Sequence, residues 1–280
     1  MKRYGILANP AKHSLSPVMH NAAFKALHMR AHYEIFEVPE NELAKFMKFV
    51  RNEPIEGLSV SLPYKEKVMQ YLDKINKEAL KIGSVNTIVN SEGFLYGFNT
   101  DYLASNKALF IDMKGRHVPT KDPIAVVIGA GGAARAVCYG LLKMGIHVWV
   151  ANRTKEKADA IAIEFAEMFN EAEIHSNDLN DLKTGDILIN TTSIWTKEPK
   201  IRIQNLPYFC SSEYVRKFKL VMDLCYNPLE TPLIKAAKRI GIEYVTGDKM
   251  LLYQAVDQFE LWTGKKPPVE VMRDALEAEL

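Results

Sequence analysis

The sequence predicts an α/β protein of two domains. Short apolar runs typical of buried strands alternate with stretches of helical periodicity along the chain. A glycine-rich turn at residues 129–134 follows one apolar run and leads into a helical stretch. Just before it, a polar segment at residues 114–122 contains a glycine and a proline and is typical of a linker. We therefore expect the domain boundary in this segment or in the helix before it.

The first part of the chain predicts one α/β unit. Strands are expected at residues 3–9, 32–38 and 57–62, followed by a hairpin of strands 85–90 and 94–97, and helices are expected at 17–27, 40–51 and 102–112. Ser16 is the expected N-cap of the first helix, and Pro17 its first residue. A further helix is expected from Lys65 to the mid-seventies, because Val68 and Ile75 lie on one helical face.

The second part of the chain predicts a doubly wound parallel sheet. Strands are expected at residues 123–128, 147–151, 186–190, 219–223 and 243–245, and helices at 133–144, 155–169 and 231–240. This alternation is typical of strands that run parallel and are connected by helices. Residues 195–216 indicate a loop with a short helix, and two helices at about 250–263 and 269–280 end the chain.

Composition excludes several classes of protein. The net charge of +2 gives no footprint for a polyanion, so no nucleic-acid partner is expected. No apolar run approaches the roughly 20 residues that span a bilayer. The three cysteines, Cys138, Cys210 and Cys225, have no paired spacing, which indicates reduced thiols in a cytoplasmic protein. The histidines and cysteines form no cluster with metal-ligand spacing, so no metal is expected.

The glycine-rich turn predicts a dinucleotide site. Its residues are Gly129, Ala130, Gly131, Gly132, Ala133 and Ala134. Glycines allow the tight turn and let the backbone approach a diphosphate at the helix N-terminus, whereas an alanine at the last position still lets the helix pack on its strand. The alternative is a purely structural connection between a strand and a helix.

The end of the following strand indicates which dinucleotide binds. NAD-binding units carry a carboxylate there for the ribose 2′-hydroxyl, but this chain has Asn152, Arg153 and Thr154. A guanidinium can bind a 2′-phosphate through paired N–H groups, so the residues favour NADP. The alternative is a Thr154 N-cap beside solvated cations. Thr191 and Ser193, after the 186–190 strand, are expected to line the cofactor.

Polar residues at strand ends in the first part suggest a proton-transfer pair. If Lys65 lies in the first turn of a helix, the helix dipole favours loss of its proton. Asp101 also ends a strand, and a lysine and an aspartate facing a nicotinamide could relay the proton of an alcohol. The alternatives are a surface lysine and an aspartate that only caps a helix. Ser14 and Ser16 could bind a carboxylate or polyol, or Ser16 could only cap its helix.

These motifs together resemble the shikimate dehydrogenase family over nearly the whole chain. The matching stretches are residues 13–17, 60–65, 83–87, 99–101, 129–136, 152–154, 190–193, 226–233 and 247–254. The resemblance implies reduction of 3-dehydroshikimate to shikimate with NADPH, in aromatic amino-acid biosynthesis. It also implies that the last helices return to the first domain. The expected domains are then residues 1–104 with 248–280 for substrate, and a Rossmann-like unit of 105–247 for NADP.

The resemblance also implies a role for individual residues. Lys65 would carry the proton and Asp101 would orient it. The expected substrate residues are Ser14 and Ser16 for the carboxylate, Ser61, Asn86 and Gln254 for the ring hydroxyls, and Tyr226 from the cofactor side. The expected cofactor residues are Gly129, Ala130, Gly131, Gly132, Ala133, Asn152, Arg153, Thr154, Thr191, Ser193, Gly247 and Met250. We expect a monomer or homodimer with a small-molecule substrate.

The chain departs from the family pattern at several positions. Ser59 stands where Asn is usual, and Ser61 where Thr is usual. Tyr102 replaces a common Gly, and Ile194-Trp195 replaces Val-Gly, so the indole either narrows the nicotinamide side or fills a loop. These departures leave two alternatives to an NADP-dependent shikimate dehydrogenase open. They are a quinate/shikimate dehydrogenase of broader substrate and cofactor use, and a non-catalytic binding relative.

Overall fold

The computed structural model describes residues 1–110, 121–197 and 207–280. These residues form two compact units. The first unit contains Met1–Asp101 and Leu252–Glu279, and the second contains Tyr102–Leu251. The expected linker, residues 114–122, lies mostly outside the described residues. The chain thus leaves the first unit after Asp101 and returns to it at Leu252.

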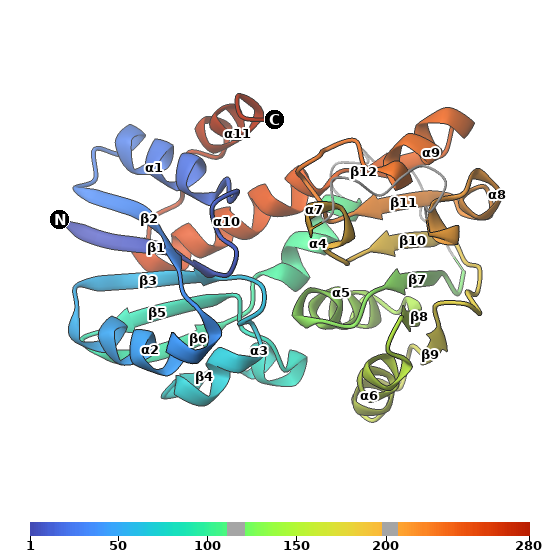
Figure 1. The fold of residues 1–280 in the computed structure, drawn as a ribbon, viewed down its shortest axis with the longest axis horizontal. Helices are drawn as coiled ribbons and strands as arrows, with labels where there is room; N and C mark the ends of the chain where they lie inside the picture. The colour runs from blue at the N-terminus through green and yellow to red at the C-terminus, as the bar shows by residue number, and fades with distance from the viewer. Residues whose placement is uncertain (111–120, 198–206) are drawn as a thin grey trace. The chain divides into compact units, whose positions relative to one another are not determined.

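The first unit is built on a mixed sheet of six strands (Figure 1). Its strands are β1 (Lys2–Ala8), β2 (Ala31–Glu37), β3 (Ile55–Val60), β4 (Lys74–Ile75), β5 (Thr87–Ser91) and β6 (Phe94–Phe98). The strand order is β2-β1-β3-β5-β6-β4. Strands β1, β2 and β3 run parallel, whereas β5 is antiparallel to both β3 and β6. The predicted hairpin is therefore confirmed, and it joins the parallel part of the sheet to its far edge.

Helices cover this sheet. They are α1 (Ser16–Ala26), α2 (Leu43–Asn52), α3 (Lys77–Ile82), α11 (Val269–Glu277) and the part of α10 (Gly247–Thr263) that follows Met250 and Leu251. Helix α2 buries Leu43, Met47 and Val50 in an apolar core with strand residues such as Leu58. A second core is aromatic, because Phe24 of α1 and Phe259 of α10 pack with their ring centroids 5.1 Å apart. The last helices therefore complete the first unit, as the family resemblance implies.

Two local predictions for the first unit are wrong. Residues 68–75 are not a helix but a short 3₁₀ helix, Lys67–Tyr71, followed by strand β4. The main-chain N–H groups of Asp73 and Asn76 bond to carbonyls of Leu95 and Gly97, so pairing with β6 replaces helical hydrogen bonds. Ser16 is the first residue of α1 and not its N-cap, a position held by Leu15 without a side-chain hydrogen bond.

The second unit is a parallel, doubly wound sheet. Its strands are β7 (Ile124–Ile128), β8 (His147–Asn152), β9 (Ile174–Asp178), β10 (Ile187–Asn190), β11 (Leu220–Asp223) and β12 (Glu243–Val245). The order β12-β11-β10-β7-β8-β9, with every pair parallel, is that of a dinucleotide-binding Rossmann fold. Strands β7 and β10 are adjacent at the centre, where the winding reverses. The predicted fold class is confirmed, although β9 was not among the predicted strands.

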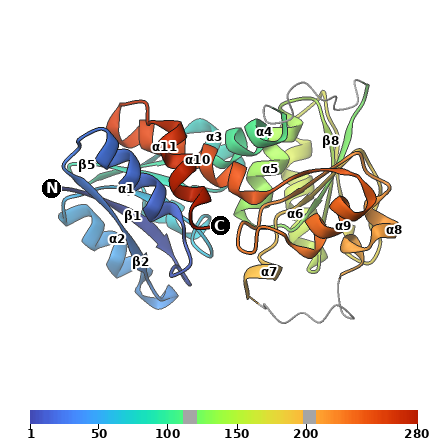
Figure 2. The same cartoon turned by 90° about the horizontal axis from the view of Figure 1, so that it is seen from above.

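Helices α5 (Gly132–Leu142), α6 (Lys155–Ala166) and α9 (Pro232–Ile240) cover the second sheet, and the other helices of this unit pack around them (Figure 2). The others are α4 (Asp101–Phe110, Asp101 itself belonging to the first unit), α7 (Ile194–Lys197), α8 (Ser212–Val215) and the start of α10, with a 3₁₀ helix at Tyr208–Cys210. All three cysteines of the chain are buried and free. Within the described ranges, no helix is long and apolar enough to cross a membrane.

Candidate active site

A buried ion pair lies at the centre of the candidate site. The Lys65 ammonium donates to Asp101 Oδ2 at 2.5 Å, and their side chains are only 14% and 4% exposed. Lys65 lies in a turn between β3 and the 3₁₀ helix, so the expected effect of a helix dipole on it is wrong. The alternative of an ordinary surface lysine is also wrong. A direct carboxylate partner, from a segment distant in sequence, defines the environment of this ammonium.

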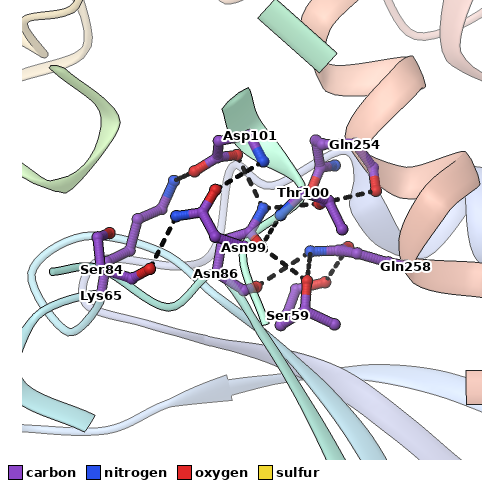
Figure 3. A network of polar contacts seen from close by, with 10 residues as sticks. Ser59, Lys65, Ser84, Asn86, Asn99, Thr100, Asp101, Gln254 and Gln258 are labelled. Atoms are coloured by element: carbon purple, nitrogen blue, oxygen red, sulfur yellow. Dashed lines mark hydrogen bonds and ion pairs between the residues drawn. The ribbon is translucent and has the colours of Figure 1, made fainter. Parts of the chain in front are cut away.

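The side chain of Asn86 holds the carboxylate of Asp101 in place, and that of Asn99 holds its main chain (Figure 3). Asn86 Nδ2 donates to Asp101 Oδ1 at 2.8 Å and to Thr100 Oγ1 at 2.9 Å. Asn99 Oδ1 accepts the main-chain N–H of Asp101 at 3.0 Å. The Thr100 hydroxyl in turn donates to the main-chain carbonyl of Gln254 at 3.2 Å. The structure therefore brings four of the predicted residues, Lys65, Asn86, Asp101 and Gln254, into one region.

Sequence reasoning missed a buried glutamine in this network. Gln258, only 1% exposed, donates to the main-chain carbonyl of Asn86 at 3.0 Å and to Thr87 Oγ1 at 3.1 Å. Its Oε1 accepts the Ser59 hydroxyl at 2.7 Å, and Tyr33 donates to Ser59 Oγ at 2.7 Å. The hydroxyl of Ser59, one of the departures from the family pattern, therefore both accepts and donates a hydrogen bond within the first unit. A polar residue on the apolar side of an expected helix was the only sequence signal.

The expected substrate serines lie elsewhere in the first unit. Ser14 Oγ accepts the main-chain N–H of Ser16 at 3.3 Å, so Ser14 satisfies one of the main-chain donors at the start of α1. Ser16 is buried, whereas Ser14 and Ser61 are half-buried. Among the described residues, no side-chain hydrogen bond joins these serines to the Lys65–Asp101 network. In the second unit, Tyr226 is half-buried after β11.

The glycine-rich turn has the backbone that a diphosphate site needs. Gly129 has φ of +116°, and a Cβ there would lie 2.3 Å from Thr191 Oγ1. Gly131 differs, because a Cβ there would meet no atom of the described residues within 4 Å. Protein packing therefore requires glycine at Gly129 but not at Gly131. An open backbone at the N-terminus of α5 fits the close approach of a phosphate group.

Charged groups after β8 fit a 2′-phosphate. Arg153 is exposed and its guanidinium has no hydrogen-bond or ion-pair partner within the described part of the chain. Lys155 differs, because it pairs with Asp159 at 2.7 Å. Asn152 Nδ2 donates to the carbonyl of Thr154 at 2.9 Å and so orders the turn. Thr154 occupies the N-cap position of α6, but its side chain makes no cap hydrogen bond.

A buried carboxylate explains the unusual tryptophan. Trp195 is only 5% exposed, and its indole N–H donates to Asp223 Oδ2 at 3.0 Å. Burial raises the pKa of Asp223 to about 6, while hydrogen bonds from Thr231, Cys225, Asn190 and Trp195 act in the opposite direction. The indole therefore packs into the core of the second unit.

The remaining predicted cofactor residues are also in the second unit. Thr191 Oγ1 donates to the carbonyl of Ile128 at 2.8 Å, at the carboxyl end of β7. Ser193 is half-buried, whereas Gly247 and Met250, in the first turn of α10, are buried.

Tyr102, another departure from the family pattern, packs edge-on against Tyr139 with ring centroids 5.6 Å apart. Within the described residues, no three His, Cys, Asp or Glu side chains gather in a way that could hold a metal.

Three protein-family models match the chain. They describe a shikimate dehydrogenase substrate binding domain (residues 6–88), a shikimate / quinate 5-dehydrogenase (residues 114–226) and a shikimate 5'-dehydrogenase C-terminal domain (residues 249–277). A shikimate dehydrogenase (NADP(+)) of Methanocaldococcus jannaschii is 41% identical over 279 residues, covering 98% of this chain and 96% of the relative. The chain belongs to the shikimate dehydrogenase family.

Solved structures of the family share the fold. A shikimate dehydrogenase crystallised in complex with NADP+ is 40% identical, with a TM-score of 0.88 over 99% of this chain and 95% of that chain. The shikimate 5-dehydrogenase of Thermus thermophilus, in complex with NADP(H) and shikimate, is 36% identical, with a TM-score of 0.84 over 100% of both chains. The division into a substrate-binding and a Rossmann-like NADP-binding domain is therefore that of the family.

Proposed function

We propose that the chain is an NADP-dependent shikimate dehydrogenase, which interconverts 3-dehydroshikimate and shikimate. The buried Lys65–Asp101 pair carries this proposal, because oxidation of an alcohol needs a group that takes the hydroxyl proton. Full-length relatives with the same named activity support it. The reaction belongs to aromatic amino-acid biosynthesis, and we place the enzyme in the cytoplasm as a monomer or homodimer.

Lys65 transfers the proton, and Asp101 positions Lys65 for this transfer. In the reductive direction, the Lys65 ammonium donates a proton to the carbonyl oxygen of 3-dehydroshikimate as the carbon gains a hydride. In the oxidative direction, the neutral Lys65 amine takes the hydroxyl proton of shikimate. Asp101 orients Nζ through the 2.5 Å hydrogen bond and stabilises the ammonium. NADPH supplies the hydride, and NADP+ accepts it in the reverse reaction.

The remaining predicted residues would bind and orient the two ligands. Ser14 and Ser16 bind the substrate carboxylate, whereas Ser61, Asn86, Gln254 and Tyr226 contact the ring and its hydroxyls. The main chain of residues 129–133 would hold the diphosphate, and Asn152, Arg153 and Thr154 would hold the adenosine 2′-phosphate. Thr191, Ser193, Gly247 and Met250 line the path to the nicotinamide. The open backbone of Gly131 and the available guanidinium of Arg153 support the cofactor part of this assignment.

A panel of substrates and cofactors tests the proposal. We expect turnover of shikimate with NADP+ to exceed turnover of quinate with NAD+. Equal or faster oxidation of quinate with NAD+ would instead identify a quinate/shikimate dehydrogenase. Lys65→Ala and Asp101→Asn should each lower kcat by about a hundredfold or more while the fold is retained. Wild-type turnover in both variants would refute the catalytic roles, and no turnover of either substrate would favour a non-catalytic binding protein.

A further inference from the structure

A chain of buried hydrogen bonds leads from Tyr33 toward the catalytic pair. The Tyr33 hydroxyl donates to Ser59 Oγ at 2.7 Å, and the Ser59 hydroxyl donates to Gln258 Oε1 at 2.7 Å. These three residues are 1%, 4% and 1% exposed, respectively. Because Ser59 Oγ accepts one hydrogen bond and donates the next, its hydroxyl has a fixed direction. The Gln258 amide oxygen therefore faces Ser59, and its NH₂ group faces the other way.

The NH₂ group of Gln258 continues the chain in the same direction. It donates to the carbonyl of Asn86 at 3.0 Å and to Thr87 Oγ1 at 3.1 Å, so the Thr87 hydroxyl is left as a donor. That hydroxyl donates to Asn86 Oδ1 at 2.7 Å. With its oxygen occupied, Asn86 turns its NH₂ group toward Asp101 Oδ1 at 2.8 Å. One unbroken series of donors thus leads from Tyr33 through Ser59, Gln258, Thr87 and Asn86 to the carboxylate that holds Lys65, with branches to the Asn86 carbonyl and to Thr100 Oγ1.

We infer that Gln258 is a positioning residue, which fixes the orientation of the Asn86 amide and thereby that of the Lys65–Asp101 pair. Gln258 acts on both the main chain and the side chain of Asn86. It bonds directly to the main-chain carbonyl, and it acts on Oδ1 through the hydroxyl of Thr87. The main-chain N–H of Thr100 also donates to Asn86 Oδ1 at 2.8 Å, so loss of Gln258 weakens this orientation without abolishing it. The inference rests on the proposed function, because it assigns Gln258 a role in that same site.

The test compares two substitutions on α10. Gln258→Met keeps the length of the side chain and removes both ends of its amide. The matched control, Trp262→Phe, removes a buried hydrogen bond from the same helix to β5, which the indole N–H donates to the carbonyl of Ile88 at 2.9 Å. Both variants lose buried hydrogen bonds between α10 and residues 86–88, two in Gln258→Met and one in Trp262→Phe. Only Gln258→Met interrupts the chain that leads to Asp101.

We expect Gln258→Met to lower kcat for shikimate by about tenfold and to raise KM for shikimate, with KM for NADP+ within about twofold of wild type. A merely structural role would not separate the two ligands in this way. Trp262→Phe should keep kcat within about twofold, even where it lowers the stability to urea. The inference is overturned if Gln258→Met keeps wild-type kcat, or if Trp262→Phe loses as much.

A second variant covers the case in which Gln258→Met does not fold. Ser59→Ala keeps Gln258 but removes the donor that fixes its Oε1, so the amide can turn over and leave the Asn86 carbonyl unbonded. We expect a smaller fall in kcat, about threefold, with the same rise in KM for shikimate alone. Wild-type constants in this variant would overturn the inference. If Lys65→Ala abolishes turnover while both Gln258 and Ser59 variants are fully active, only the inference fails and the proposed function stands.

Discussion

Acidification should destabilise the first unit through a single buried histidine. His20 is 0% exposed and stacks on Tyr33 with ring centroids 4.5 Å apart, and the rings of Phe259 and Trp262 also lie near it, with centroids at 6.3 and 5.1 Å. Neither of its ring nitrogens has a hydrogen-bond partner among the described residues. Burial therefore lowers the pKa of His20 to about 3, because nothing compensates the loss of water around a charged imidazole.

The size and sign of the effect follow from this pKa. The imidazole titrates near pH 6.5 in the unfolded chain and near pH 3 in the folded one, so the unfolded state binds more protons between these values. The contribution of His20 to the free energy of unfolding is fully present above about pH 6.5. It falls by about 1.4 kcal/mol for each pH unit below that, down to the folded pKa of about 3. Between pH 7 and pH 5, His20 alone should remove about 2 kcal/mol from the free energy of unfolding.

Urea unfolding at pH 7 and pH 5 measures this contribution. His20→Phe keeps an aromatic ring and removes the titration, so its stability should fall by about 2 kcal/mol less than that of the wild type over this interval. The carboxylates common to both proteins, including buried Asp223, cancel in the comparison. Replacement of the exposed His32 by Gln is the matched control for the loss of a histidine side chain. Equal pH dependence of wild type and His20→Phe would refute the reasoning.

Three further predictions concern the second unit. In steady-state assays, Arg153→Ala should raise KM for NADP+ about tenfold or more and leave activity with NAD+ unchanged. Lys155→Ala removes a cation that is already paired with Asp159, so KM for NADP+ and KM for NAD+ should each change by less than about threefold. For Gly131→Ala, the free energy of unfolding in urea should stay within about 1 kcal/mol of the wild-type value, since the added Cβ meets no atom of the described residues. The same variant should bind NADP+ more weakly in a fluorescence titration, because the Cβ occupies space that a phosphate needs. Trp195→Phe should lower the free energy of unfolding by about 1–3 kcal/mol, because the buried carboxylate of Asp223 loses a donor; unchanged stability would contradict this role.

The second unit could be predicted largely from the sequence because its signals are local. The continuous apolar run before Gly129 indicates a strand that is buried on both faces, and the turn chemistry follows from the glycines. Strand β9 escaped prediction because it has the polar sequence IHSND and lies at the sheet edge, where β8 is its only partner strand among the residues that the structure describes. Its strand conformation is fixed by its neighbour and not by its own residues.

In the first unit, distant contacts override local patterns. Val68 and Ile75 have helical spacing, but hydrogen bonds to the β6 strand hold this segment in another conformation. The Lys65–Asp101 pair was predicted by residue type and family motif, whereas its geometry depends on segments 36 positions apart. Gln258 was missed because its partner Asn86 lies 172 positions away, and one polar residue on a helix does not reveal such a partner.

The distribution of thiols gives this enzyme a natural probe of one of its units. All three cysteines belong to the second unit, and the first unit has none. Burial raises the pKa of Cys138 and of Cys225 to about 12, and burial also raises the pKa of Cys210 above its usual range, so the thiols of the folded unit resist thiolate chemistry. A thiol reagent can therefore react only when this unit opens. The rate of thiol modification therefore reports local unfolding of the NADP-binding unit alone. Any slowing by added NADP+ measures how much the bound cofactor stabilises that unit against unfolding.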